Sequence, residues 1–468
     1  MPSSAMEHNL ENGGFVMAGI VQQGAHVPPE IEKQIHMIGN AHLDPVWLWQ
    51  WPEGLGAMRA TFRSALDRME ETDGFVFTSS QAVMYEYVEK CDPQLFADIR
   101  ERVLEGRWVI VGGWWVQADC NIPGNEGFVR QALYGVRYFR EKFGVDIRVG
   151  YNVDSFGHSA ALPQILKKSG MDYYVFMRPG PHEKPELPGR LFHWESPDGS
   201  KVLAYQIPFS YLASGWGNEL VEKIGKTKDE LSEKQPLLMC FYGVGNHGGG
   251  PTKENLENIQ AAALASKDVE ILFSDPLQFF TALEKCSLDL PVVKDDLQHH
   301  ASGCYSVHSE IKQNNRRAEH SLVSAEKIAS SATNLVDHPY PKEDFGPGRV
   351  SCSTSSMISS PALPLGKPMM VFEEFNHPGQ LPRTYAGLAI DAPNILVSAV
   401  KQSEDDDSYV VRAYEAYGQP TQCSFEWNQG AIRWSSGFGP FEIKTFLVPS
   451  AWSKQVVELD LIERPLGV

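Results

Sequence analysis

The feature that most constrains the fold is a regular alternation of short apolar runs with longer amphipathic segments between residues 33 and 300. Helical spacing of apolar residues marks segments such as Gly54–Glu70 and Glu126–Phe143. Strands separated by helices are typical of βαβ units, so we predict an α/β domain with a mostly parallel sheet. The apolar runs expected to be strands are Ile35–Ile38, Phe75–Phe77, Trp108–Val111, Ile147–Tyr151, Tyr173–Phe176, Leu237–Tyr242 and Asp296–His300.

The chain changes character after residue 303. Ser309–Asn334 carries apolar residues at helical spacing, and a Ser/Pro/Gly-rich stretch separates it from short alternating segments such as Ser408–Tyr414. The acidic run Glu404–Asp407 fits a solvated hairpin turn. The predicted order of parts is an N-terminal arm (1–34), a β/α domain (35–305), a helical domain (306–345), a linker (346–369) and a β-sandwich-like part (370–468).

Composition excludes several classes of protein. The 468 residues suffice for two or three domains, and 41 Lys+Arg against 59 Asp+Glu give a net charge of -18. This acidity argues against nucleic acid and anionic membrane surfaces as partners. We see no signal peptide and no apolar stretch of membrane-spanning length, so we expect a cytoplasmic protein. Seven scattered cysteines without a CxxC pair argue against a disulfide framework or a thiolate zinc site.

Aromatic residues make up 11% of the chain, and some of them cluster. Trp47, Trp49 and Trp51 lie within five residues, and Trp114–Trp115 form a second group. Such clusters favour a platform that stacks against a sugar ring, and the alternative is packing in a large core. We expect a sugar to bind at both clusters.

His42 and Asp44 directly follow the first expected strand. Alternate residues of extended backbone share one face, so the imidazole and the carboxylate can point at one centre. The pair suits a divalent metal site at the C-terminal end of a parallel strand. The alternative is a His–Asp hydrogen bond that only fixes the loop.

Asp154 lies in the segment Asn152–His158, again directly after an apolar run. Catalytic carboxylates of β/α domains belong at the C-terminal ends of strands. The alternative role of Asp154 is to cap the helix expected over Ala161–Lys168.

Two further segments bring polar groups to strand ends. The glycine-rich turn Gly243–Gly250 contains Asn246 and His247. It lacks the Lys-Ser/Thr pair of a phosphate-binding loop and suits close approach of the backbone to a polyhydroxyl ligand. His299 and His300 end the last expected strand, where neighbours face opposite ways, so one of them can join the groups described above. Two imidazoles and two carboxylates suit zinc or a related divalent ion.

Three motifs in combination resemble a known family. His42–Trp47, Gly112–Trp115 and Asn152–His158 look, in order and spacing, like the motifs of glycoside hydrolase family 38, the α-mannosidases. The resemblance covers residues 35–312 and extends to Phe372–Asn376 and the β tail. It implies a seven-stranded-type β/α barrel-like catalytic domain with a mostly parallel sheet, then a helical bundle and an all-β C-terminal part. Family members are usually much longer, so we expect a shortened three-helix bundle here.

The resemblance also implies a role for each site residue. It implies that His42, Asp44, Asp154 and His300 bind a zinc ion, with His299 as the alternative fourth ligand, and that Asp154 is the catalytic nucleophile. The family arginine that contacts the nucleophile corresponds to Arg178, which would keep the carboxylate ionised. The expected substrate-binding residues are Trp47, Phe156, Arg178, Asn246, His299 and Asp119.

The implied activity is that of a retaining exo-α-mannosidase acting on terminal residues of α-mannosides or manno-oligosaccharides. Such an enzyme needs a nucleophile and a general acid/base about 5–5.5 Å apart, and the zinc ion would hold the 2- and 3-hydroxyls of the sugar. Many relatives have an aspartate in the glycine-rich turn, where this chain has Asn246 and His247. His247 is therefore one candidate acid/base and Asp119 is the other. Large members of the family often associate, so a homo-oligomer is among the expected states.

Two other functions fit parts of the same pattern. A metal-dependent carbohydrate deacetylase or amidohydrolase on a β/α barrel also uses His-x-Asp and a divalent ion, but its metal activates water. A non-catalytic carbohydrate-binding protein would use the aromatic residues and the β tail, and it would need no buried cluster of carboxylates around a metal.

Overall fold

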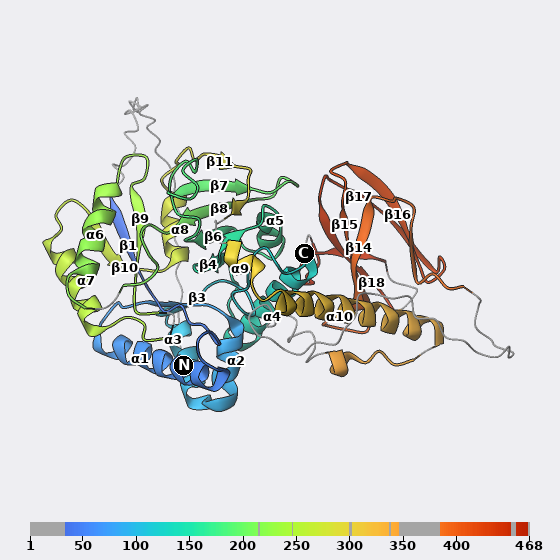
Figure 1. Cartoon of the computed structure of the whole chain (residues 1–468), viewed down its shortest axis with the longest axis horizontal. Coiled ribbons are helices and arrows are strands. Elements are labelled where there is room, and N and C mark those ends of the chain that lie inside the picture. The colour runs from blue at the N-terminus through green and yellow to red at the C-terminus, as the bar shows by residue number, and fades with distance from the viewer. Residues whose placement is uncertain are drawn as a thin grey trace, which may run out of the picture.

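The computed structural model describes residues 33–213, 216–245, 247–298, 302–336, 338–345, 384–450 and 455–466. Figure 1 shows an α/β part beside the long helix α10 and an all-β part. The linker expected over 346–369 and almost all of the N-terminal arm lie outside the described residues, as do Asn246, His299 and His300.

The first sheet of the α/β part is parallel and centred on β1 (Gln34–Asn40). β1 pairs with β9 (Leu237–Tyr242), β10 (Glu270–Phe273) and β2 (Phe77–Ser79), and β3 (Trp108–Ile110) pairs with β2. β1 and β9 are buried almost throughout, which explains their continuous apolar character, because helices cover both faces of such sheets. β1, β3 and β9 agree with the predicted strands, β2 begins two residues later than predicted, and β10 was not predicted.

The second sheet continues the α/β part. Its strand order is β11-β7-β8-β6-β4, and all neighbours are parallel except the antiparallel pair β7 and β8. β7 and β8 are absent from the strands predicted above. The bounds are β4 (Val149–Asn152), β6 (Tyr173–Phe176), β7 (Leu191–Glu195), β8 (Lys201–Gln206) and β11 (Val292–Val293).

Hydrogen bonds at two places connect the two sheets. The amide of Gly112, just after β3, donates to the carbonyl of Val149 in β4 at 2.7 Å. The hydroxyl of Tyr205 in β8 donates to the carbonyl of Met239 in β9 at 2.9 Å. The predicted α/β class with a mostly parallel sheet is confirmed. The seven-stranded barrel type stays a prediction, because the strands pair as two sheets.

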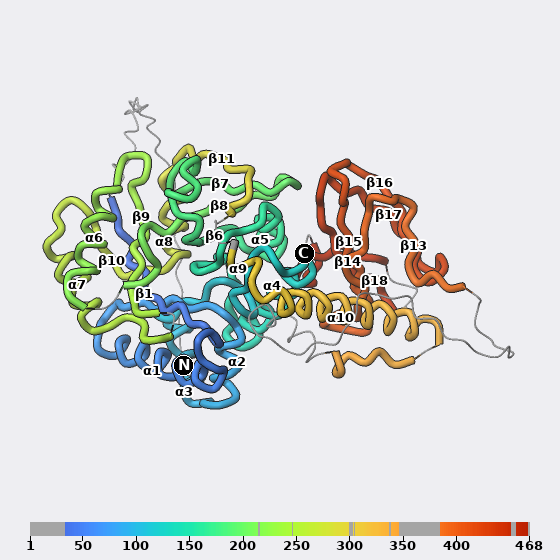
Figure 2. Tube along the Cα trace, in the orientation of Figure 1, coloured from blue at the N-terminus to red at the C-terminus, as the bar shows by residue number. Residues whose placement is uncertain are grey.

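Helices pack around these sheets (Figure 2). In α1 the stripe of Met58, Phe62, Leu66 and Met69 is buried, so the helix exists because it covers the sheet with one apolar face. The bounds are α1 (Trp51–Glu71), α2 (Ala82–Cys91), α3 (Pro93–Leu104), α4 (Asn125–Phe143), α5 (Leu162–Lys168), α6 (Glu219–Glu230), α7 (Lys253–Ala265) and α8 (Pro276–Glu284).

The C-terminal part follows two helices, α9 (Ser302–Ser306) and α10 (Ser309–Val336). The predicted long helix is present, whereas a three-helix bundle stays a prediction. The all-β part consists of two antiparallel sheets, β13-β16-β17 and β14-β15-β18-β19, with apolar side chains clustered in their core. The bounds are β13 (Leu388–Ile390), β14 (Ile395–Gln402), β15 (Tyr409–Glu415), β16 (Thr421–Trp427), β17 (Ile432–Phe438), β18 (Ile443–Val448) and β19 (Val457–Leu459).

The acidic run near residue 405 is a hairpin turn, as predicted. β14 and β15 pair up to Gln402 and Tyr409, and Asp405–Asp407 between them are exposed. Three of the four acidic side chains of the run are therefore exposed, whereas Glu404 is partly buried and pairs with Lys401 at 2.7 Å.

A buried ion-pair network joins the α/β part to the C-terminal part. On α4, Arg130 pairs with Glu126 at 2.9 Å and with Glu326 of α10 at 2.6 Å, and Arg412 of β15 pairs with Glu126 at 2.8 Å. Burial alone would raise the pKa of Glu126, but the charges of Arg412 and Arg130 lower it to about 2. Three elements from distant parts of the sequence thus share one set of compensated charges.

The described residues also bear on two predictions from composition. No helix in this part of the chain has the length and apolar content of a membrane span. The described cysteines Cys91, Cys120, Cys240, Cys286 and Cys423 are free thiols, as the cysteine pattern predicts.

Candidate active site

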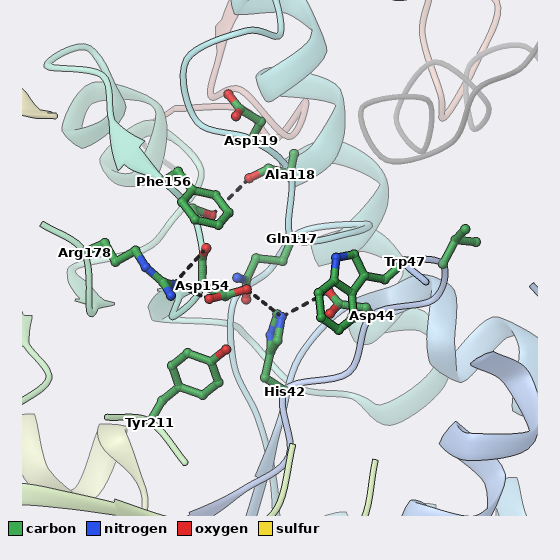
Figure 3. Close-up of a pocket in the computed structure, with 12 residues that line it drawn as sticks. His42, Asp44, Trp47, Gln117, Ala118, Asp119, Asp154, Phe156, Arg178 and Tyr211 are labelled. Carbon is green, nitrogen blue, oxygen red and sulfur yellow. Dashed lines mark hydrogen bonds and ion pairs between the residues drawn. The ribbon is translucent and has the colours of Figure 1, made fainter. Parts of the chain in front are cut away.

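A pocket of about 410 Å³ opens where several strands of the α/β part end. Each lining residue belongs to a segment that follows a strand, and the carboxyl ends of parallel strands meet at one edge of a sheet. Figure 3 shows the lining side chains. They are His42, Asp44, Val46, Trp47, Gln117, Ala118, Asp119, Asp154, Ser155, Phe156, Arg178 and Tyr211.

Three of the predicted metal ligands converge in this pocket (Figure 3). His42 Nε2 lies 3.3 Å from Asp44 Oδ1 and 3.7 Å from Asp154 Oδ2. The His42 side chain is 3% exposed, and the two carboxylates are partly accessible from the pocket. Because the imidazole faces carboxylates from two different strand ends, its contacts extend beyond fixing its own loop.

The donor set fits a divalent cation, since zinc accepts both imidazole nitrogen and carboxylate oxygen. Within the described residues, no group of three or more His, Cys, Asp or Glu side chains is arranged so that it could hold a metal ion. The expected fourth ligand, His300, and its alternative His299 lie outside those residues. β12 (Leu297–Gln298), directly before them, pairs with β5 (Gly157–His158), so the chain there runs beside the Asp154 segment.

Asp154 has a fixed partner. Arg178 Nη1 donates a hydrogen bond to Asp154 Oδ1, and the Arg178 guanidinium lies 4.8 Å from the centre of the Phe156 ring. The carbonyl of Arg178 accepts a hydrogen bond at 2.8 Å from Nε2 of His158, which is fully buried. The alternative role of Asp154 as a helix cap is wrong, because α5 begins after Ala161 without a side-chain cap.

Tyr211 is a site residue that sequence reasoning missed. It lies on the loop after β8, and its ring meets that of His42 edge to face at a centroid distance of 5.4 Å. Burial, then the charge of Asp154 and a hydrogen bond to its carboxylate, raise the pKa of Tyr211 well above its ordinary value. The Tyr211 hydroxyl therefore stays protonated and donates to Asp154.

Gln117 was missed as well. Its side chain is buried at the pocket wall, and its backbone N–H donates to Gln81 Oε1 at 3.2 Å. Gln117 comes after β3 and Tyr211 after β8, and this position after a strand is the signal that would have selected both.

The two predicted acid/base candidates are placed differently. Asp119 lines the pocket, and Figure 3 shows it on the far side of Phe156 from Asp154. Asp119 Oδ1 accepts hydrogen bonds from the amides of residues 121 and 122, each at 2.8 Å. His247 does not line the pocket. Its ring packs against Trp49 at 4.1 Å, and its Nε2 lies 3.6 Å from an exposed Glu53 carboxylate.

The aromatic clusters divide into a pocket residue and core residues. Trp47 lines the pocket and is 60% exposed, as a stacking platform requires. Trp49 is buried, and its indole donates to the carbonyl of Asp44 at 3.1 Å. The prediction of a sugar at Trp114–Trp115 is wrong, because both side chains are buried in the hydrophobic core, at 2% and 4% exposure.

Comparisons with known proteins match most of the described α/β part. A sequence profile described as "Glycosyl hydrolases family 38 N-terminal domain" matches residues 32–302, and one described as "Glycosyl hydrolases family 38 C-terminal beta sandwich domain" matches residues 394–446.

Curated relatives are similar over the same region. The chain is 33% identical over 306 residues to "Alpha-mannosidase 2C1" of Homo sapiens, which covers 65% of this chain and 29% of that protein. It is 31% identical over 311 residues to "Alpha-mannosidase G" of Dictyostelium discoideum, covering 66% and 28%. The chain thus spans under a third of the length of these relatives.

A solved structure shares the fold. An alpha-mannosidase from Enterococcus faecalis V583 superposes with a TM-score of 0.62 at 19% sequence identity, covering 70% of this chain and 39% of that one. At this identity the likeness concerns the arrangement of strands and helices.

Proposed function

The chain belongs to glycosyl hydrolase family 38, and from this premise we propose that it is a retaining exo-α-mannosidase that removes terminal α-D-mannosyl residues. The single observation that carries the proposal is the setting of Asp154. Its carboxylate faces His42, holds an ion pair with Arg178 and borders a pocket with an exposed tryptophan, Trp47, at its edge. A pocket of about 410 Å³ has the size of a site for a small ligand such as a monosaccharide unit.

Asp154 is the nucleophile in this proposal. Arg178 and the Tyr211 hydroxyl hold the orientation of its carboxylate, because both donate hydrogen bonds to it. The free carboxylate electron pair attacks the anomeric carbon while the bond to the leaving oxygen breaks, and a covalent glycosyl-enzyme forms. Water then displaces Asp154 from the opposite side, so the anomeric configuration is retained.

A divalent metal ion is part of the proposal because imidazole nitrogen and carboxylate oxygen are both zinc ligands. His42, Asp44 and Asp154 would hold it, and a bound zinc ion would supply Lewis-acidic contact to the 2- and 3-hydroxyls of the sugar. Trp47 offers its exposed face to the ring, and Phe156 limits the pocket on the side of Arg178.

The general acid must protonate the leaving oxygen from the side opposite the nucleophile. Of the two candidates we favour Asp119, since it lines the pocket across Phe156 from Asp154, whereas His247 packs outside the pocket against Trp49.

Covalent trapping tests the proposal directly. A fluorinated mannosyl donor with a good leaving group should form a stable adduct, and peptide mass spectrometry should locate it on Asp154. A deacetylase or amidohydrolase that activates water makes no such adduct. Absence of the adduct in an enzyme that does hydrolyse aryl α-mannosides, or an adduct elsewhere, would contradict the assignment.

Metal removal tests the zinc assignment separately. Dialysis against a chelator should abolish hydrolysis of an aryl α-mannoside, and added Zn²⁺ should restore it, while circular dichroism checks that the fold persists. Full activity of the metal-free protein would contradict the metal assignment.

A further inference from the structure

Lys223 is a buried cation that the proposed mechanism does not use. It lies on α6 and is 6% exposed. Its ammonium donates to three backbone carbonyls, those of Ser210, of Leu212 at 3.1 Å and of Phe241 at 2.7 Å. Burial lowers its pKa, partly offset by the nearby Cys240 thiol and the Glu219 carboxylate.

The carbonyls that Lys223 binds bracket Tyr211. Ser210 and Leu212 are its two neighbours in the chain, so the ammonium grips the backbone on both sides of the residue that donates to Asp154. The carbonyl of Tyr211 itself accepts from Asn40 Nδ2 at 2.9 Å.

The same two side chains bind this loop to the end of β9. Lys223 also contacts the carbonyl of Phe241, and Asn40 Nδ2 also donates to the carbonyl of Tyr242 at 3.1 Å. Three consecutive loop carbonyls, 210 to 212, are therefore bound by buried side chains that hold the last residues of β9 as well. The backbone of Tyr211 has little freedom to move relative to the sheet.

A buried ammonium is costly, because it loses its hydration and here gains carbonyl dipoles rather than a carboxylate as partners. An apolar side chain of similar length would fill the same space without that cost, but the three carbonyls would lose their donor. The buried ammonium thus lowers the stability of the fold, and in the same arrangement it fixes the conformation of the loop beside the pocket.

We propose that Lys223 is a positioning residue that fixes the Tyr211 loop, so that the Tyr211 hydroxyl is held against the Asp154 carboxylate. The inference rests on the proposed function, because the consequence it predicts is a change in the rate of glycosyl transfer to Asp154.

A double-mutant cycle tests this coupling. Tyr211→Phe removes the hydroxyl and should lower kcat on an aryl α-mannoside about 10-fold, since a hydrogen bond to a charged group is lost. Lys223→Met keeps the aliphatic stem and should lower kcat by a similar factor with KM changed less than about 2-fold. In the Tyr211→Phe background Lys223→Met should cost less than about 2-fold more, because the contact it protects is already gone.

Controls separate this role from a merely structural one. Lys228→Met on the same helix removes a surface ammonium that pairs with Asp268, and it should leave kcat unchanged. Thermal unfolding of each variant reports on the fold. If Lys223→Met does not fold, Lys223→Gln, which retains N–H donors, replaces it in the same cycle.

The outcomes divide clearly. A lowered Tm with normal kcat, or losses that multiply in the double variant, would overturn the inference, because Lys223 would then act on stability or through another group. A wild-type protein without α-mannosidase activity would instead contradict the proposed function, so the two failures are distinguishable.

Discussion

Two polar segments meet the same edge of the α/β part, and they are built in opposite ways. In the nucleophile segment, Asn152–His158, the side chains carry the contacts. Asp154 binds Arg178, and the buried His158 holds the Arg178 backbone. In the glycine-rich turn, Gly243–Gly250, the contacts are made by backbone groups.

The glycine-rich turn is held by main-chain hydrogen bonds and by close packing on α1. Val244 and Gly250 exchange hydrogen bonds of 2.9 and 2.7 Å, and the amide of Gly249 donates to Thr61 Oγ1 at 2.8 Å. Gly248 has a φ of 130° and a Cβ there would lie 2.8 Å from the same hydroxyl, so only glycine fits. The difference teaches that one segment fixes functional side chains, whereas the other fixes a shape and leaves His247 outside the pocket.

Removing the nucleophile should give the largest effect. Asp154→Asn should lower kcat by on the order of 10⁴-fold or more, because the neutral amide cannot form the glycosyl-enzyme. Hydrolysis of an activated aryl mannoside measures it, and azide should partly rescue turnover as the β-mannosyl azide. Zinc content is determined in parallel, since Asp154 is also a predicted ligand. Activity within about 10-fold of wild type would contradict the nucleophile assignment.

Arg178→Met comes next. It leaves the Asp154 carboxylate without its cationic partner, and we expect a loss of roughly 300-fold in kcat/KM. Arg178→Lys keeps the positive charge but loses the planar guanidinium group, so its kcat/KM should lie between those of the wild type and Arg178→Met. If Met and Lys variants were equally active, the charge of Arg178 would have no role in the segment.

The acid/base candidates test the other side of the comparison. Asp119→Asn should lower kcat about 100-fold on a mannoside with a poor leaving group, with little change on an activated aryl mannoside, because only the former needs a proton. Equal slowing on both substrates would show that Asp119 supports the loop rather than protonating the leaving oxygen.

His36, in the buried part of β1, leads to a prediction about how stability depends on pH. The residues at the pocket end of β1 lead to predictions about activity. His36 in β1 donates to or accepts from Ser274 Oγ at 2.8 Å, and burial lowers the pKa of His36 from 6.5 to about 4. Between these values the unfolded chain binds a proton that the folded chain excludes, so stability falls as the pH falls.

We expect His36 to lower the free energy of unfolding by about 2 kcal/mol between pH 6.5 and about pH 5. Urea unfolding at several pH values measures it, with His36→Gln as the comparison. An unchanged pH slope in that variant would show that His36 does not control acid stability.

The smallest effect is expected at the glycine-rich turn. His247→Ala should change kcat less than about 2-fold on both good and poor leaving groups, because its ring packs outside the pocket. A selective loss on the poor leaving group would reverse the comparison and make His247 the acid.

β1, β6 and β9 were predictable because each is a short, almost wholly apolar run, whereas the parallel strands β10 and β11 were missed. β1 and β9 are buried on both faces, so their sequences signal strands without any knowledge of the fold. For the same reason the groups directly after them, such as His42 and Asp44, could be selected as site candidates.

The antiparallel pair β7 and β8 was missed, and Tyr211 with it. These strands are mostly buried, but His193, Glu195 and Lys201 interrupt their apolar runs. The chain between them, 196–200, is a tight turn in which the amide of Gly199 donates to the carbonyl of Ser196 at 2.9 Å. The Pro-Asp-Gly sequence of that turn was a usable hairpin signal. The Lys223 contacts had no local signal, because they join residues brought together only by the folded sheet.

The error at Trp114–Trp115 has a physical cause. Neighbouring aromatic residues were interpreted as a sugar platform, but adjacent tryptophans after β3 pack into the core between the sheet and α4. Composition cannot separate a stacking surface from a packed one, since both need large rings.

The Glu126 network has a consequence for how such chains can be recombined. Its four charges come from α4, α10 and β15, and the single charges of α10 and β15 find their partners only on α4. A chimera that took its C-terminal sheets from a relative lacking a cation at the place of Arg412 would inherit an uncompensated carboxylate in its interior. The C-terminal sheets of a relative can therefore replace those of this chain only where that relative carries a cation at the place of Arg412. The buried ion pairs thus restrict which α/β parts and C-terminal parts can be combined.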